Sequence, residues 1–280
     1  MNELVQLKNL NKVFQTQSSK PHQVIKDLNL SIKDNDFISV IGSNGAGKST
    51  MMNLIAGTIP LSSGQIYLDD REISALPAYK RAKMISRVFQ DPQMGTAKSL
   101  SVEENLAIAY KRGHKRSFQT SITKDMREEF RSRLSTLGMG LENRMQERVS
   151  SLSGGQRQVL TLLMAVLQTP KLLLLDEHTA ALDPRTSAMV MSLTQDLVSE
   201  YQLTTLMITH DMNDALTYGN RLIMLHDGQV VVDISGEEKE NCSIDDLLQL
   251  FHHNVGESLN NDELLLANKV KPNPFNESTF

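Results

Sequence analysis

A glycine-rich stretch, Gly42-Ser-Asn-Gly-Ala-Gly-Lys-Ser-Thr50, decides the fold. The apolar, β-branched run Phe37-Ile-Ser-Val-Ile41 comes directly before it and predicts a buried strand, and residues 48–56 read as a helix. A strand, a glycine-rich loop and a helix in this order form a phosphate-binding pattern. Glycines at 42, 45 and 47 allow the backbone to turn its N–H groups toward phosphate oxygens, and the helix N-terminus favours an anion.

The side chains of this loop indicate which phosphate compound it binds. Lys48 is expected to reach the β- and γ-phosphates of a nucleotide, and the Ser49 hydroxyl is expected to bind Mg²⁺. We therefore expect a nucleoside triphosphate and Mg²⁺ as ligands. The predicted nucleotide-binding residues of the loop are Gly42, Ser43, Asn44, Gly45, Ala46, Gly47, Lys48, Ser49 and Thr50.

A second motif places two acids at the end of an apolar strand. Leu172–Leu175 predicts a buried strand, and Asp176 and Glu177 follow it directly. The carboxylate of Asp176 suits a metal contact, directly or through water. Glu177 is one residue further on and is expected to orient or deprotonate an attacking water as a general base. Together the two motifs predict a nucleotide hydrolase of the P-loop class.

The remaining pattern predicts an α/β core with two additions. Residues 1–35 alternate apolar and polar positions and predict antiparallel strands joined by a polar connection, Gln15–Pro21. Residues 92–166 are expected to be mainly helical, and Ser101 and Glu104 have the spacing of a capping box. Later strands alternate with helices, which predicts a parallel sheet with crossover helices.

The stretch Leu152-Ser-Gly-Gly-Gln156 lies between the phosphate loop and the acidic strand. It resembles the signature motif of the ABC ATPase family, and its place between the other two motifs makes this resemblance specific. The resemblance covers roughly residues 3–235. It implies that the signature motif of one subunit contacts the γ-phosphate bound by a second copy. The residues it would use are Ser153, Gly154, Gly155 and Gln156.

Other positions match the family pattern in the expected order. Gln90 resembles the Q-loop glutamine, which in the family touches the metal and the attacking water. His210 resembles the switch histidine at the γ-phosphate, and Ala181-Leu-Asp183 resembles the D-loop of the dimer interface. Phe14 is a candidate for stacking on adenine, although its position also suits the core. One departure is His178, where the family usually has proline.

The resemblance implies a P-loop NTPase (RecA-like) core, an antiparallel β subdomain and an inserted α-helical subdomain. The expected ATPase domain covers residues 1–235, with its core at 1–91 and 167–235 and its helical subdomain at about 92–166. Residues 236–280 form the expected C-terminal tail, in which Ser243 and Asp246 could start one helix. The polar residues beyond this helix are expected to be partly disordered.

The family and the composition together predict a transport function. The net charge of -4 and the pI near 6.0 give no support to nucleic-acid binding. No run of about 18 apolar residues occurs, so a separate integral permease would form the pore. We expect a head-to-tail ATP-sandwich homodimer on the cytoplasmic face of the cell membrane, serving a permease and, indirectly, a solute-binding protein. Phrases such as FQDPQMGTA resemble importers assigned to tryptophan or tyrosine uptake; a soluble assembly-scaffold ATPase is the alternative.

Overall fold

The larger of two β-sheets runs through the centre of the molecule. The computed structural model describes residues 3–16, 19–113 and 122–255. Its six strands lie in the order β10-β9-β3-β8-β7-β6. All neighbours pair in parallel except β10, which pairs antiparallel with β9. The predicted parallel α/β sheet is confirmed. The strands are β3 (Phe37–Gly42), β6 (Ile85–Val88), β7 (Leu172–Asp176), β8 (Thr204–Ile208), β9 (Arg221–His226) and β10 (Gln229–Ser235).

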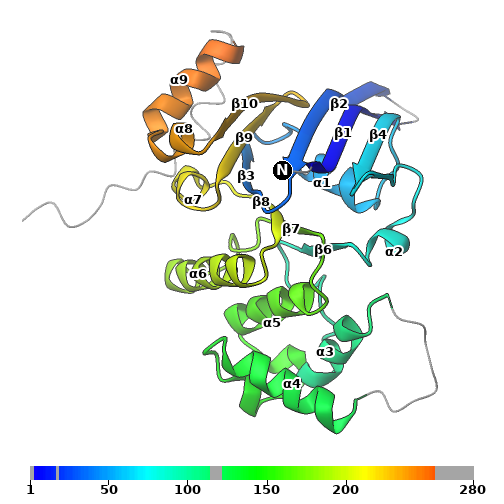
Figure 1. Cartoon of the computed structure of the whole chain (residues 1–280), viewed down its shortest axis with the longest axis vertical. Coiled ribbons are helices and arrows are strands. Elements are labelled where there is room, and N and C mark those ends of the chain that lie inside the picture. Colours follow the sequence, from blue (N-terminus) through cyan, green and yellow to red (C-terminus); the bar gives the residue numbers. More distant parts are fainter. Residues whose placement is uncertain (1–2, 17–18, 114–121, 256–280) are drawn as a thin grey trace, which may run out of the picture.

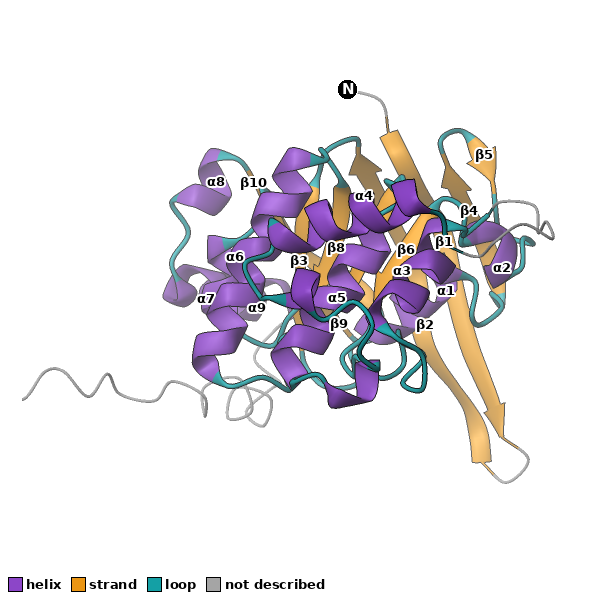
Figure 2. Cartoon of the chain, turned by 90° about the horizontal axis from the view of Figure 1, so that it is seen from below, coloured by secondary structure: helices purple, strands orange, loops and turns teal. Residues whose placement is uncertain are grey.

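A four-stranded antiparallel sheet in the order β2-β1-β4-β5 lies beside the larger one (Figure 1). Its strands are β1 (Glu3–Thr16), β2 (Ser19–Lys33), β4 (Ser63–Leu68) and β5 (Arg71–Glu72). The expected polar connection Gln15–Pro21 was too long, because β1 continues to Thr16 and β2 begins at Ser19. Thr16 and Ser19 pair with each other at the end of a hairpin that projects from the molecule (Figure 2).

Helix α1 (Lys48–Ala56) packs in a core cluster shared by both sheets. Met51 and Ile55 are fully buried there with Leu7 of β1 and Val40 of β3. Because α1 begins directly after the glycine-rich loop, this packing fixes the loop against both sheets. The other helices of this part are α2 (Ala78–Arg81), α6 (Pro184–Glu200) and α7 (Met212–Thr217).

The expected helices of residues 92–166 lie together at one end of the molecule (Figure 1). They are α3 (Val102–Tyr110), α4 (Lys124–Ser135) and α5 (Gly154–Val166), with the 3-10 turns η1 (Leu141–Asn143) and η2 (Val149–Ser151). The predicted capping box is confirmed: Ser101 N donates to Glu104 Oε2 over 2.7 Å, and Glu104 N donates to Ser101 Oγ over 3.3 Å. Phe130 of α4 is fully buried in the core that these helices share with β7. The division into subdomains stays a prediction.

Two helices, α8 (Glu237–Glu240) and α9 (Ile244–Val255), follow β10. The predicted start of α9 is correct, because Asp246 N donates to Ser243 Oγ over 3.2 Å. Leu247 and Phe251 of α9 are buried with residues of β9 and β10. The predicted disordered tail falls in residues 256–280, outside the described part of the chain.

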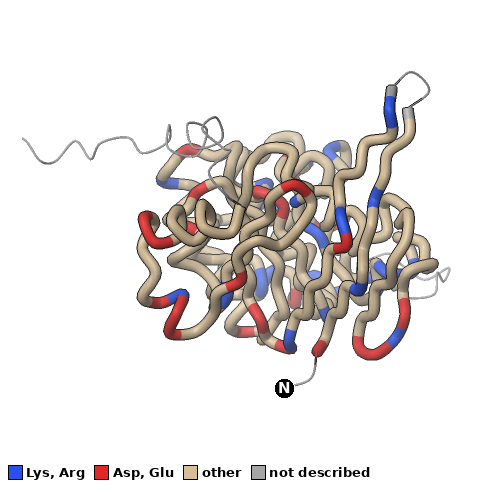
Figure 3. Tube along the Cα trace, turned by 90° about the horizontal axis from the view of Figure 1, so that it is seen from above, with Lys and Arg blue, Asp and Glu red and all other residues tan. Residues whose placement is uncertain are grey.

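The surface charges and the helix lengths bear on possible partners. Along the described trace, Lys and Arg positions are interspersed with Asp and Glu positions (Figure 3). Over the described ranges, no helix combines the length and apolar character that a membrane crossing requires.

Candidate nucleotide-binding and catalytic site

The phosphate loop runs from the end of β3 into α1, and two of its glycines are sterically required. Gly42 has φ +145°, and a Cβ there would lie 2.1 Å from the carbonyl oxygen of Leu225. Gly47 has φ +101°, and a Cβ there would lie 2.8 Å from Ile25 Cδ1. Gly45 has φ +85° with open space around it, which leaves the backbone accessible to a ligand.

Lys48 is buried at the start of α1 and faces the loop that precedes it. Its Nζ donates to the carbonyl oxygens of Gly42 over 2.6 Å and Ser43 over 3.0 Å. Burial lowers the pKa of Lys48, while the carboxylates of Glu177 and Asp176 act in the opposite direction. A buried ammonium on neutral carbonyls at the edge of a cavity suits an anionic ligand, so this loop fits a nucleotide phosphate.

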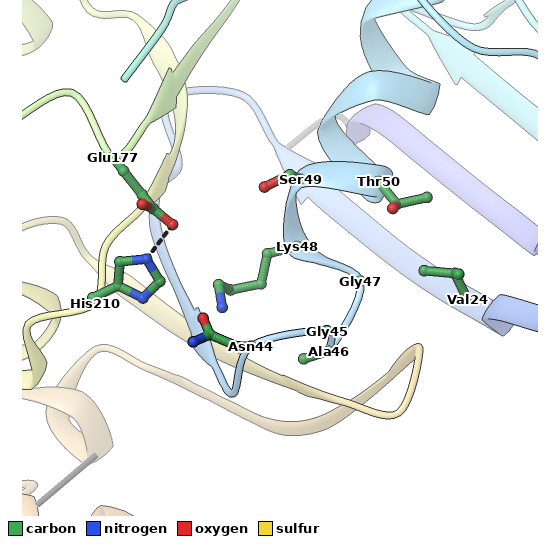
Figure 4. A pocket seen from close by; sticks show the side chains of 10 residues that line it. All are labelled: Val24, Asn44, Gly45, Ala46, Gly47, Lys48, Ser49, Thr50, Glu177 and His210. Atoms are coloured by element: carbon green, nitrogen blue, oxygen red, sulfur yellow. Dashed lines mark ion pairs between the residues drawn. The ribbon is translucent and has the colours of Figure 1, made fainter. Parts of the chain in front are cut away.

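A cavity lies over the loop, and elements far apart in the sequence form its walls (Figure 4). Val24 of β2 closes one side, and Glu177 and His210 close the opposite side. The remaining lining residues are Asn44, Gly45, Ala46, Gly47, Lys48, Ser49 and Thr50. The structure therefore brings most of the predicted loop together with two predicted catalytic side chains.

Glu177 lies at the carboxyl end of β7 in an unusual backbone conformation. Its φ is +47°, in the left-handed region that few non-glycine residues adopt. Its N–H donates to Ile208 O over 3.1 Å, and its carbonyl accepts from Ala180 N over 3.0 Å. Its side chain is only 12% exposed and forms an ion pair with His210 Nε2 (Figure 4). A second cleft, lined by residues from 177–191 and 209–218, shares Glu177 and His210 with this cavity.

Asp176 does not line the described cavity with Glu177, and its carboxylate is paired with an arginine. Arg87 of β6 donates from Nη2 to Asp176 Oδ2 over 2.5 Å and from Nη1 to Asn53 Oδ1 of α1 over 2.6 Å. Sequence reasoning missed Arg87. The available signal was a charged residue inside the short strand Ile85–Val88, which begins and ends with an apolar residue.

Two other predicted residues lie outside the lining of this cavity as described. Phe14 is 40% exposed on β1, on the same hairpin as Val24, and the Nζ of Lys12 lies 4.9 Å from its ring centroid. Gln90 is exposed in the segment that follows β6. Both are accessible to a ligand or to a second chain, and their roles stay predictions.

The signature stretch forms the N-terminus of α5, away from the phosphate-loop cavity. Ser153 and Gln156 form a reciprocal capping box, with Gln156 N donating to Ser153 Oγ over 3.2 Å and Ser153 N donating to Gln156 Oε1 over 3.2 Å. Gly155 packs closely on α6, since a Cβ there would lie 2.4 Å from Thr186 Cγ2. Within one chain, these residues do not join the lining of the described cavity.

Comparison with known proteins places this geometry in a family. The ABC transporter family profile matches residues 25–180. The chain belongs to the ABC transporter family. It is 46% identical over 252 residues to the "Tyrosine transport ATP-binding protein" of Clostridioides difficile (strain R20291), covering 90% of this chain and 100% of that protein. It is 33% identical over 230 residues to the "Spermidine/putrescine import ATP-binding protein PotA" of Haemophilus ducreyi, covering 82% of this chain and 57% of that protein.

Solved ABC cassettes have the same fold as this chain. The dimeric cassette MJ0796 in a post-hydrolysis state, bound to ADP and Pi, is 30% identical with a TM-score of 0.70; the match covers 82% of this chain and 98% of that one. The ADP conformation of the cassette MJ1267 has a TM-score of 0.73 at 24% identity, over 92% of this chain and 100% of that one, and supports the fold alone. This ABC protein is therefore an ATPase that uses ATP and Mg²⁺, and it serves a transport system.

Proposed function

We propose that the loop Gly42–Thr50 holds the phosphates of ATP in the described cavity. The open backbone at Gly45 and the buried ammonium of Lys48 support this role. Ser49, Asp176 and Gln90 supply the hydroxyl, carboxylate and amide oxygens that suit Mg²⁺, which would neutralise charge on the phosphates. Asp176 must then share its carboxylate between the metal and Arg87.

Glu177 is the proposed general base. A water molecule attacks the γ-phosphorus, Glu177 takes a proton from it, and the bond from the γ-phosphorus to the bridging oxygen breaks to give ADP and Pi. His210 orients Glu177 through their ion pair and faces the same cavity. Glu177 has a left-handed backbone, and its side chain lines the cavity.

A second copy of the chain completes the site in this proposal. Ser153, Gly154, Gly155 and Gln156 lie outside the cavity of their own chain, and the N-terminus of α5 suits a phosphate. The 30% identical cassette MJ0796 is dimeric, which supports a second copy as the partner. Hydrolysis then removes the γ-phosphate that joins the two copies, so ATP controls whether the dimer is closed.

We propose that this cycle drives the import of an aromatic amino acid, with tyrosine the first candidate. The single observation that carries this proposal is the 46% identity to a tyrosine transport ATP-binding protein over its whole length. The protein would act at the cytoplasmic face of the cell membrane through a separate permease, fed by a solute-binding protein. In this proposal residues 92–166 receive the permease, and residues 236–280 form an accessory C-terminal segment.

An uptake assay tests the cargo. Cells of the source organism lacking this gene, complemented with wild type or Glu177→Gln, would be given labelled tyrosine, tryptophan and putrescine. We expect wild type alone to restore aromatic amino-acid uptake. Restored putrescine uptake with unchanged tyrosine and tryptophan uptake would contradict the proposed cargo.

A pull-down tests the transport partners separately. Tagged Glu177→Gln protein with ATP would be purified from detergent-solubilised membranes and its partners identified by mass spectrometry. We expect an integral permease. Recovery of soluble partners alone would favour the assembly-scaffold alternative.

A further inference from the structure

The residue after Glu177 is a histidine buried between β7 and α6. His178 is 2% exposed, and its Nε2 lies 3.0 Å from Thr194 Oγ1 on α6. Thr194 is itself fully buried.

The hydrogen bonds of Thr194 determine which partner donates. Its hydroxyl donates to the carbonyl of Val190, one turn earlier in α6, over 2.7 Å. The hydroxyl has only one proton, so toward His178 it can only accept. His178 must therefore carry its proton on Nε2 and donate to Thr194. Two hydrogen bonds, from His178 Nε2–H to Thr194 and from Thr194 to the carbonyl of Val190, therefore link the loop after β7 to the middle of α6.

The hydrogen bond from His178 to Thr194 constrains the main chain next to the proposed base, Glu177. The Glu177 backbone is held on one side by Ile208 of β8 and within its loop by Ala180. The bond from His178 to Thr194 adds the third support, and it joins the same peptide segment to α6. A left-handed backbone at a non-glycine residue persists only where the surroundings hold it.

We infer that His178 is a positioning residue, whose hydrogen bond to Thr194 fixes the backbone of Glu177 so that its carboxylate faces the cavity. The inference rests on the proposed role of Glu177 as general base. Loss of the bond would let the carboxylate shift away from the attacking water while leaving the phosphate loop unchanged. The expected defect is therefore in turnover rather than in ATP binding.

Matched substitutions on both sides of the bond test the inference. His178→Gln keeps a donor at the position of Nε2, whereas His178→Asn places the same amide one bond too short to reach Thr194. Thr194→Ser keeps the hydroxyl, and Thr194→Val removes it with little change in shape. The readouts are kcat and KM for ATP hydrolysis, the Kd for ATP, and chemical denaturation to show that each variant is folded.

We expect His178→Asn and Thr194→Val each to lower kcat about tenfold with KM changed less than about twofold, the scale expected for a small misplacement of a catalytic group. His178→Gln and Thr194→Ser should restore most of kcat. The double variant His178→Asn with Thr194→Val should be no slower than the slower single variant, because both remove one bond. Wild-type kcat in folded Thr194→Val, or multiplicative losses in the double variant, would overturn the inference.

Glu177→Gln measured in the same series separates this inference from the role it rests on. If Glu177→Gln loses turnover while Thr194→Val and His178→Asn do not, the positioning role of the His178–Thr194 hydrogen bond is wrong. The assignment of Glu177 as the base then stands. If Glu177→Gln retains turnover, the base assignment itself fails and the inference fails with it.

Discussion

At the scale of single residues, Lys48 and Glu177 face the same cavity with different tasks, and substitutions should separate them. Glu177→Gln keeps shape and removes the base, so we expect hydrolysis to slow about 10²- to 10⁴-fold while ATP binding is retained. Lys48→Ala removes the buried cation and should weaken ATP binding itself. Fluorescent-nucleotide titration and steady-state hydrolysis measure the two effects. Normal turnover in Glu177→Gln would remove Glu177 from the role.

His178 also gives the protein a defined pH dependence of stability. Burial lowers its pKa from 6.5 to about 4 in the folded protein. Between these values the unfolded chain binds a proton that the folded chain does not, so the free energy of unfolding falls as the pH falls. From pH 7 to pH 5 this one group should cost about 2 kcal/mol.

His178→Gln is the matched control for this effect, since it removes the titrating group and keeps the donor. Urea denaturation of both proteins at pH 7, 6 and 5 would give the difference in slope, and the other histidines cancel. Identical pH slopes in wild type and His178→Gln would show that the pKa of His178 is not depressed.

At the scale of elements, the contact of α5 with α6 distinguishes two neighbouring glycines. A Cβ at Gly155 would lie 2.4 Å from Thr186 Cγ2, whereas a Cβ at Gly154 would lie 3.7 Å from Leu182 Cδ2. We expect Gly155→Ala to destabilise the fold by about 1–3 kcal/mol, as overpacking does. Gly154→Ala should change stability by less than about 1 kcal/mol. Thermal denaturation compares them.

Thermal denaturation of the double variant Gly155→Ala with Thr186→Ser tests whether the clash with Thr186 causes the loss of stability. Serine at 186 lacks the methyl group that the new Cβ would meet and keeps the backbone donor that bonds to Asp183. Stability should recover. If the pair is no more stable than Gly155→Ala alone, the clash with Thr186 is not the reason.

The elements themselves were largely predictable from the sequence, because buried strands and capped helices are local patterns. The run Leu172–Leu175 and the Ser101 capping box needed only neighbouring residues to be read correctly. The length of the β1–β2 hairpin was missed because the polar residues Thr16 and Ser19 pair with each other at its end. Arg87 with Asp176 and His178 with Thr194 were missed for another reason: strand order and helix packing, which no local pattern encodes, bring these pairs together.

At the scale of the whole molecule, the separation of the signature stretch from the cavity predicts ATP-dependent association. Glu177→Gln with ATP should elute as a dimer in size-exclusion chromatography, and adding Ser153→Arg should keep it a monomer that still binds ATP. The large arginine side chain would occupy the surface that closes on the partner's γ-phosphate.

Ser153→Ala is the control for this experiment, because Ser153 also caps α5. Loss of the cap costs about 0.5–2 kcal/mol of stability but adds no bulk. Dimerisation should therefore survive in Ser153→Ala. If Glu177→Gln dimerises with ATP as readily when it also carries Ser153→Arg, the shared-site arrangement is contradicted.

The hydrogen bond between His178 and Thr194 limits which pairs of residues related sequences can carry at positions 178 and 194. A histidine at 178 without a hydroxyl at 194 leaves its Nε2–H without a partner in the buried core, whereas a hydroxyl at 194 without a donor at 178 still has its bond to Val190. Histidine at 178 should therefore occur together with a hydroxyl at 194 among relatives. Lineages with proline at 178 should be free to carry valine at 194, whereas lineages with histidine should keep threonine or serine.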